Sequence, residues 1–514
     1  MRPQRLLSGV LTVGGWTLLS RILGFARDLM IASLVGPGAV MDAYVAAFRL
    51  PNMFRRFFAE GAFNAAFVPM FSKRLEAEEN PLGFASLALS GLSLVLLVLT
   101  GLSMIFMPVL VFATAEGFYG DARFDLTVDF ARVTFPYILF ISLAALLSGV
   151  LNASGRFAAA AAAPVLLNVI LVAAMVIAWA MGGPVAQALI WGIPLAGVAQ
   201  LALVWRAADK AGLRVRPVRP RWTPEMATLV RIAVPAALAG GVVQVNLLVG
   251  QLVASNYDSA VSWLYSADRL YQLPLGVVGI AVGIVLLPDL SRRLRARDSD
   301  GARDALSRAG EISLALTIPC AVALVVIAEP LVSVLFQRGA FGPADTAATA
   351  LAVAVYGLGL PAFVMQKVLQ PIYFAREDTR NPFRFALVAM AVNAVAAIGL
   401  AYVIGFIAAA VATTLAGWVM VWLLLRGRAG MGAETRFDDR FRHRLPRICI
   451  ASGIMGGVLW SVAWVGADAL NTPGLRYLAL LTLIAAGAVS YFGAGQIIGA
   501  FRLAEFKAAL RRKG

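Results

Sequence analysis

Arginine side chains recur inside long apolar stretches of this chain. Arg21 and Arg27 lie in the first such stretch, and Arg269 lies near the middle of a later one. A guanidinium group keeps its charge at any working pH, and its fork of donors matches the oxygens of a phosphate group. Each arginine inside a membrane costs about 2.5–3.5 kcal/mol, so it needs a partner, water or a ligand. Several arginines with few acids therefore indicate an anion-binding cavity, and a diphosphate is the group that best suits such a set.

These charges fall on polar stripes of three expected helices. At about 100° per residue, the polar residues of the first apolar stretch, 9–35, share one arc of its helix. The stretches 39–71 and 259–289 carry similar stripes, although Pro51 makes the helical phase beyond it uncertain. The three stripes comprise Thr17, Ser20, Arg21, Gly24, Arg27 and Asp28, then Asp42, Arg49, Asn52, Arg55 and Arg56, then Ser262, Tyr265, Ser266, Arg269 and Gln272.

A purely structural interpretation remains open for several of these residues. Arg55 and Arg56, with Arg49, could lie close enough to a helix end for the head group to reach water. Arg27 could pair with Asp28 or Asp42 and simply hold helices together. Arg21 and Arg269 each lie near the middle of a stretch, so a ligand-binding role is favoured for them. For Lys367, in another apolar stretch, a structural role and a ligand-binding role are both open.

The composition places these stripes in a membrane protein. Apolar residues make up 60% of the 514, charged residues 14%, and the mean hydropathy is +0.81. The apolar stretches are long enough to cross a bilayer and number about fourteen. We expect an all-α integral membrane protein in which the segment 39–71, broken by Pro51 and Gly61, is one kinked crossing.

The distribution of basic residues predicts one orientation. With fourteen crossings and both termini in the cytoplasm, most of the 44 lysine and arginine residues fall on the cytoplasmic side, and only Arg123, Arg338 and Arg476 fall on the periplasmic side. This is the asymmetry expected of one consistent topology. The net charge of +16 is then a topology signal, with anionic membrane lipids as neighbours and no nucleic-acid partner.

Weak internal similarity predicts a repeated unit. Pro136 and Asn168 recur at matching spacing as Pro361 and Asn393. Two copies of six helices in the same orientation would form two parallel lobes around a central cavity. We expect an N-lobe over 1–222 (helices 1–6), a C-lobe over 223–430 (helices 7–12) and two extra helices, 13 and 14, over 431–514.

The same residues resemble a known family. Ser20-Arg21-Ile-Leu-Gly24-Phe25-Ala26-Arg27-Asp28, Asp42-Ala-Tyr, Phe48-Arg49-Leu-Pro51-Asn52, Arg55-Arg56-Phe-Phe-Ala-Glu60-Gly61 and Ala267-Asp268-Arg269-Leu270 are similar to the signature of the MurJ (MviN) family, in the MOP exporter superfamily. The resemblance implies a flippase of the bacterial inner membrane. It would move lipid II, the undecaprenyl-diphosphate-linked peptidoglycan precursor, from the cytoplasmic to the periplasmic leaflet by alternating access.

The resemblance also implies roles for particular residues. It places substrate binding at Arg21, Arg27, Asp28 and Arg269, with Ser20, Asn52 and Arg55 beside them, and gating or support at Asp42, Arg49, Arg56, Glu60, Gln272 and Lys367. Helices 13 and 14 would hold the polyprenyl tail. Many relatives have glutamate where this chain has Gln272, which puts a salt-bridge or ion-coupling role there in doubt. The protein would act as a monomer without cofactor or metal, near cell-wall synthesis or division proteins.

Three other functions are alternatives to this one. A flippase for another lipid-linked oligosaccharide would also need a cationic cavity, so only the signature separates it. A multidrug antiporter of the same superfamily should show buried carboxylates instead. A membrane enzyme needs a general base or a metal-binding carboxylate cluster. The sole histidine, His443, lies among arginines in a basic loop, and the chain contains no G-x-x-x-x-G-K-[ST] motif for a nucleotide.

The predicted topology can be tested with reporter fusions. A reporter fused after Arg440 should lie in the cytoplasm, and one fused after Asp468 should lie in the periplasm. The two sites should differ because a single crossing separates them. Alkaline phosphatase and green fluorescent protein fusions report the two compartments. The opposite pattern would rule out the fourteen-crossing assignment.

Overall fold

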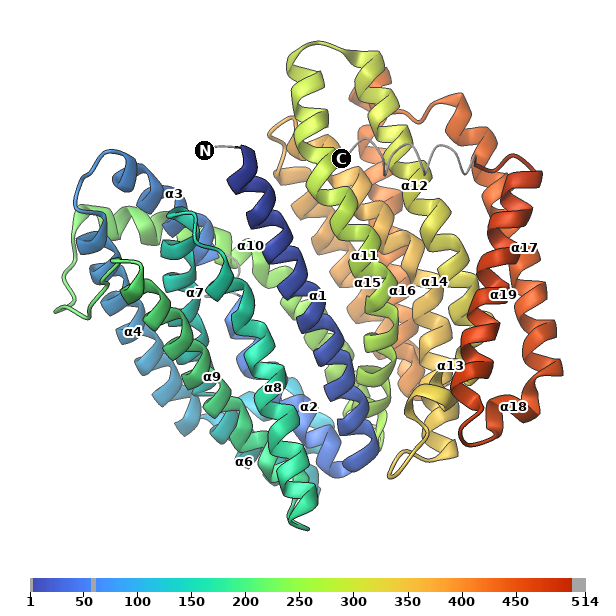
Figure 1. The fold of residues 1–514 in the computed structure, drawn as a ribbon, viewed down its shortest axis with the longest axis horizontal. Helices are drawn as coiled ribbons and strands as arrows, with labels where there is room; N and C mark the ends of the chain where they lie inside the picture. Colours follow the sequence, from blue (N-terminus) through green and yellow to red (C-terminus); the bar gives the residue numbers. More distant parts are fainter. Residues whose placement is uncertain (1–2, 57–61, 502–514) are drawn as a thin grey trace. The chain divides into compact units, whose positions relative to one another are not determined.

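A computed structural model of the chain describes residues 3–56 and 62–501. The regular secondary structure in these ranges is helical (Figure 1). Packing divides the chain into two compact units, residues 1–262 and residues 263–514. Within the described residues, nine segments are long and apolar enough to cross a membrane. The predicted total of about fourteen crossings and the predicted lobe boundaries remain predictions.

Unit 1 contains the first ten helices. The predicted crossing over 39–71 corresponds to α2 and α3, with Pro51 and Pro69 inside them; residues 57–61 between these helices, Glu60 among them, lie outside the described ranges. The helices are α1 (Pro3–Leu34), α2 (Ala39–Arg55), α3 (Ala62–Glu76), α4 (Pro81–Ile105), α5 (Met107–Thr114), α6 (Ala122–Thr134), α7 (Tyr137–Ala153), α8 (Ala158–Ala180), α9 (Val185–Lys210) and α10 (Pro224–Ala254), with the short 3-10 helix η2 (Glu116–Phe118) after α5.

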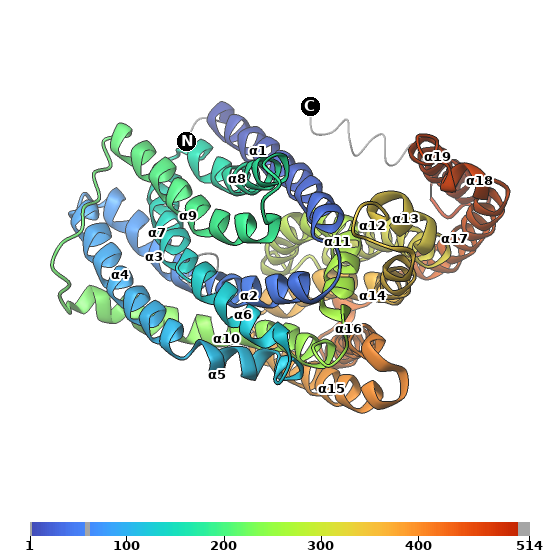
Figure 2. The same ribbon diagram turned by 90° about the horizontal axis from the view of Figure 1, so that it is seen from below.

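Unit 2 contains the remaining helices, beginning in the first turn of α11. The last three form a separate hairpin in which α17 packs against α19 and the short α18 joins them (Figures 1 and 2). The helices are α11 (Ala260–Arg295), α12 (Ser299–Val326), α13 (Ala328–Phe336), α14 (Pro343–Phe374), α15 (Arg380–Ile404), α16 (Ala408–Gly427), α17 (Asp439–Val465), α18 (Ala467–Asn471) and α19 (Arg476–Ile497), with 3-10 helices η3 (Gly405–Ile407), η4 (Arg428–Gly430) and η5 (Ala433–Thr435).

Corresponding helices of the two units pack in corresponding pairs. In unit 1, α9 packs against α8 and α7; in unit 2, α16 packs against α15 and α14. Both units also break one helix near its end, between α4 and α5 at Phe106 and between α12 and α13 at Ile327. These recurrences favour the six-helix repeat that the sequence predicts.

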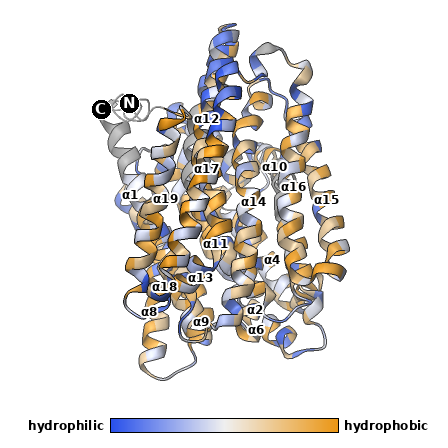
Figure 3. Cartoon of the chain, turned by 90° about the vertical axis from the view of Figure 1, so that its right-hand side faces the viewer, coloured by the Kyte–Doolittle hydropathy of each residue, from blue (hydrophilic) through white to orange (hydrophobic). Residues whose placement is uncertain are grey.

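Apolar side chains cover much of the outer surface of these helices. Hydrophobic colouring runs along α14, α15 and α16 in Figure 3, and hydrophilic colouring gathers towards helix ends. Exposed Trp460, Trp464, Leu478 and Leu481 show the same pattern on α17 and α19. Water cannot solvate such a surface favourably, whereas lipid can.

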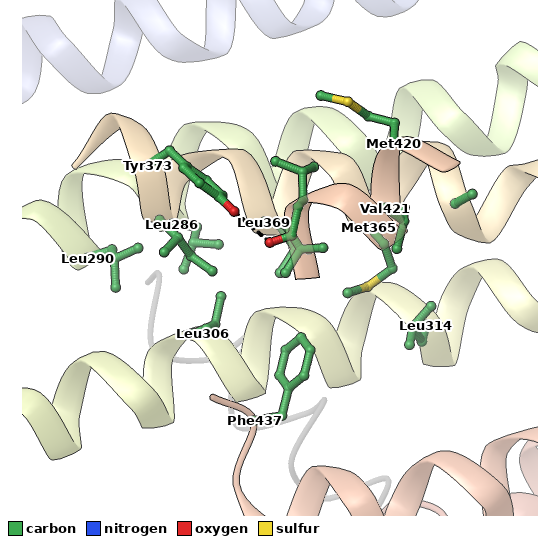
Figure 4. Close-up of a cluster of buried hydrophobic side chains, with 14 of the residues drawn as sticks. Leu286, Leu290, Leu306, Leu314, Met365, Leu369, Tyr373, Met420, Val421 and Phe437 are labelled. Carbon is green, nitrogen blue, oxygen red and sulfur yellow. Dashed lines mark hydrogen bonds between the residues drawn. The ribbon is translucent and has the colours of Figure 1, made fainter. Parts of the chain in front are cut away.

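Inside unit 2, a hydrophobic core joins α11, α12, α14 and α16. Leu286, Leu306, Met365, Leu369 and Tyr373 lie together there (Figure 4). The hydroxyl of Tyr373 donates a hydrogen bond of 2.6 Å to the carbonyl oxygen of Leu424, so its one polar group is satisfied within the core.

A buried ionic cluster fixes the terminal hairpin to this core. Glu311 on α12 is 6% exposed and accepts hydrogen bonds from Arg308, Arg440 and Arg444. The last two residues belong to α17, and Arg308 also pairs with Asp438, the N-cap of α17. One carboxylate shared by three guanidinium groups therefore ties α17 to α12.

Candidate functional site

A buried hydrogen-bonded network joins α1 to α8. The guanidinium of Arg27 contacts the Asp28 carboxylate at 2.7 Å and donates through Nη1 to the amide oxygen of Asn168 at 2.9 Å. The Asn168 amide nitrogen in turn donates to the Ser20 carbonyl oxygen at 3.0 Å and lies 3.4 Å from the Ser20 hydroxyl. Arg27, Asp28 and Asn168 are each less than 9% exposed. This Arg27 network thus unites three of the residues predicted from the sequence.

Close helix packing makes the Arg27 network possible. α1 packs along α8, as both ribbon views show (Figures 1 and 2). Gly24 lies at the contact, where a Cβ atom would stand 3.5 Å from the Asn168 amide nitrogen. A glycine on α1 and alanines on α8 let the two backbones approach closely, as small residues do in membrane helices.

Arg21 has a different environment on the same helix. Its side chain is exposed, and among the described residues it forms no hydrogen bond or ion pair. At about 100° per residue, Arg21 and Arg27 lie at opposite edges of the polar stripe. Packing of one edge against α8 therefore leaves Arg21 on the exposed edge of α1.

Asp42 is the centre of a second buried cluster in unit 1. Its carboxylate is fully buried at the start of α2, where it accepts hydrogen bonds from the Ser262 backbone N–H at 2.8 Å and from the Ser262 hydroxyl. Arg123 on α6 lies 3.7 Å from Asp42 and also pairs with Asp121 and Asp258. The carboxylate thus links α2, α6 and the first turn of α11, which suits a supporting role.

The end of α2 carries the other predicted cations of this helix. Arg55 donates through Nε to the side-chain oxygen of Asn52 at 2.9 Å, and Arg49 donates to the Leu247 carbonyl oxygen at 3.4 Å. Arg56 is exposed. Asn52 therefore holds the Arg55 side chain in place, and Arg49 joins α2 to α10.

The predicted residues of unit 2 lie on α11 and α14. Arg269 stands over the ring of Tyr265, 4.4 Å from its centroid, a cation–π contact one turn apart on α11. Gln272 donates to the carboxylate of Asp268. An acid from one turn earlier on α11 thus lies beside Gln272. Lys367 is exposed on α14.

Some residues of these clusters were not predicted as site residues. The sequence marks Asn168 only as a residue of the internal repeat, and Arg123 only as a periplasmic charge. The signal for Asn168 was available, because a carboxamide within the apolar run of α8 needs a partner. The contact between Arg123 and Asp42 gave no such signal, since it joins residues far apart in the chain.

Known proteins are similar to this chain over most of its length. The sequence profile of the family described as lipid II flippase MurJ matches residues 31–470. The probable lipid II flippase MurJ of Rhizobium meliloti (strain 1021) is 45% identical over 511 residues, which cover 98% of this chain and 95% of that protein. The lipid II flippase MurJ of Burkholderia cenocepacia is 36% identical over 393 residues, 75% of this chain and 76% of the relative.

This chain belongs to the MurJ family. It is therefore a multi-pass membrane transporter and not an enzyme, as the sequence predicted. A solved structure of the lipid II flippase MurJ in an inward closed conformation matches with a TM-score of 0.80, 26% identity, and coverage of 94% of this chain and 98% of the other.

The fold extends to more distant transporters. An inward-facing multidrug-resistance transporter of the MATE family, in the MOP superfamily, matches with a TM-score of 0.66 at 15% identity, over 81% of this chain and 95% of the other. At that identity the likeness concerns the fold alone. The family assignment rests on the MurJ matches.

Replacing Asn168 should destabilise unit 1. The substitution Asn168→Leu keeps the side-chain volume but leaves Arg27 without its amide acceptor and Ser20 without its donor, which should cost about 1–3 kcal/mol. Thermal unfolding of the purified protein, followed by tryptophan fluorescence, should show a lower midpoint.

Gln187→Leu is the matched control, because Gln187 is an exposed amide on the neighbouring helix α9. Its unfolding midpoint should stay close to that of the wild type. Equal midpoints for the two variants would mean that the Arg27 network does not stabilise the contact between α1 and α8.

Proposed function

We propose that this protein translocates lipid II from the cytoplasmic to the periplasmic leaflet of the bacterial inner membrane by alternating access, with both of its own termini in the cytoplasm. Family membership supports the substrate, since the relatives named above are lipid II flippases or probable ones. The basic clusters of the predicted cytoplasmic connections support the orientation.

The observation that carries the binding mechanism is the contrast between Arg27 and Arg21. The charge of Arg27 is balanced by Asp28, whereas Arg21 stands exposed on the same helix with no acid paired to it among the described residues. An arginine inside a membrane costs about 2.5–3.5 kcal/mol unless something offsets it. A diphosphate supplies that partner, with two groups that a guanidinium can bind in bidentate fashion.

This contrast leads us to divide the predicted site residues into three groups. We assign substrate contact to Arg21 and Arg269, and to Arg55 with Asn52 as its positioning partner. Ser20, Arg27 and Asp28 orient α1, so their role is to present Arg21. Asp42, Arg49, Arg56, Gln272 and Lys367 are supporting or gating residues in this proposal, as is Glu60, which lies outside the described ranges.

The lipid tail requires a separate apolar surface. We assign it to the hairpin of α17 and α19, where Trp460, Trp464, Leu478 and Leu481 are more than 60% exposed. A polyprenyl chain can lie against such a surface without meeting a charged group. The Glu311 cluster, which ties α17 to α12, would hold this surface in place while substrate is moved.

The proposal predicts loss of transport when the arginines are shortened. Arg21→Ala, Arg27→Ala and Arg269→Ala should each abolish function while the protein still inserts into the membrane. For Arg21 and Arg269, losing one bidentate phosphate contact, at about 1.5–3 kcal/mol, should lower diphosphate binding by about ten- to a hundredfold. Arg27→Ala should fail for a different reason, because α1 would no longer present Arg21 correctly. Growth of cells depleted of their own lipid II flippase measures function, and membrane-fraction immunoblots measure insertion.

Arg132→Ala is the matched control, because Arg132 is an exposed arginine on α6 outside these clusters. That variant should support growth. Growth with all three of the other variants would contradict the anion-binding mechanism.

A further inference from the structure

Unit 1 contains a pocket away from the Arg27 network. Its volume is about 630 Å³, and none of the residues of the Arg27 network lines it. It lies where α3 ends, α4 begins and the connection from α9 reaches α10. The sequence predicts that these helix ends are cytoplasmic. The lining residues are Arg74, Asn80, Gly83, Phe84, Leu87, Val218, Arg219, Arg221, Thr223 and Glu225.

One wall of the pocket is a connection held against α4. The backbone N–H of Arg216 donates to the Ser86 hydroxyl at 3.1 Å, and that of Val218 donates to the Ser90 hydroxyl at 2.8 Å. Ser86 and Ser90 lie one helical turn apart and are both buried. Two hydrogen bonds at matched spacing therefore hold the extended connection along the helix, and so fix the wall that carries the next arginines.

The pocket has surplus positive charge. Its three arginines face one acid, Glu225, whose carboxylate lies 3.3 Å from Arg74. A hydrogen bond from Thr223, together with the nearby charge of Arg74, lowers the pKa of Glu225. This acid therefore stays ionised and forms an ion pair with Arg74. Arg219 and Arg221 form no ion pair or hydrogen bond with any residue that the structure describes. Two guanidinium groups are thus left for an anion.

The surroundings distinguish a lipid from a dissolved anion. Trp222, which directly follows Arg221 in the chain, is 74% exposed, and Val218 is 46% exposed. Phe84 and Leu87 line the pocket beside the charges. Exposed tryptophan next to arginine is typical of the membrane–water interface, and the cytoplasmic leaflet is the one rich in anionic lipid.

We propose that this pocket binds the phosphate of an anionic phospholipid headgroup, with Arg219 and Arg221 holding the phosphate and Trp222 resting among the lipid's upper chain atoms. The bound lipid is a component of the surrounding membrane and not the transported substrate. The site would anchor the connection between α9 and α10 to the cytoplasmic leaflet. It does not depend on the proposed transport function.

Quenching of Trp222 by brominated lipid tests the proposal. The full-length protein is reconstituted in phosphatidylcholine vesicles that contain brominated phosphatidylglycerol or, at equal mole fraction, brominated phosphatidylcholine. Subtracting the signal of the Trp222→Phe variant isolates Trp222 from the other tryptophans. We expect stronger quenching by phosphatidylglycerol, a preference that falls about fivefold for each arginine removed.

Matched variants distinguish the effect of the pocket arginines from the effect of basic residues outside the pocket. Arg219→Ala/Arg221→Ala should lose the preference, whereas Arg219→Lys/Arg221→Lys should retain much of it. Lys210→Ala/Arg214→Ala removes the same charge from the end of α9 and the start of the connection, outside the pocket, and should keep the preference. Equal preference in the two alanine pairs would overturn the proposal. Displacement of the lipid by millimolar inorganic phosphate would also overturn it, because it would show a site for free anions.

Discussion

A guanidinium group inside hydrocarbon must have both its charge and its donors satisfied, and Arg27 meets this requirement through Asp28 and Asn168. Asp28 comes from the same helix and balances the charge, whereas Asn168 comes from α8 and completes the hydrogen bonds. The second contact can form in only one rotational setting of α1. An apolar contact would not fix that rotation, because lipid tails are as apolar as the side chains of the neighbouring helix.

The rotation of α1 decides what its remaining polar residues can do. With one edge of the polar stripe packed on α8, Arg21 at the other edge stays exposed. Asp42 fixes the orientation of α2 in a similar way, because its carboxylate contacts the first turn of α11 and the Arg123 guanidinium. Buried polar contacts therefore set the orientation of the two helices that carry most of the predicted binding residues.

Hydropathy and helical periodicity were sufficient to predict an all-helical membrane protein and the polar stripe of α1. They were also sufficient to single out Arg27 and Asp28 as neighbours. They could not predict which edge of the stripe would be packed, because Asn168 is far away in the chain and the contact depends on the tertiary fold. For the same reason Arg123 appeared only as a topology marker, and Asp268 was not predicted as the acid beside Gln272. The two short helices after α4 and α12 were missed because the breaks at Phe106 and Ile327 lie within apolar runs that hydropathy reads as continuous.

In the proposed mechanism, Arg21 binds the diphosphate of the substrate while Arg27 orients the helix. Equilibrium binding of undecaprenyl diphosphate to the purified protein, measured for the wild type and for Arg21→Lys, tests it most directly. Lysine keeps the charge but loses the bidentate fork, so the account predicts affinity weaker by about tenfold, with an unchanged unfolding midpoint. Equal affinities for the two proteins would contradict it.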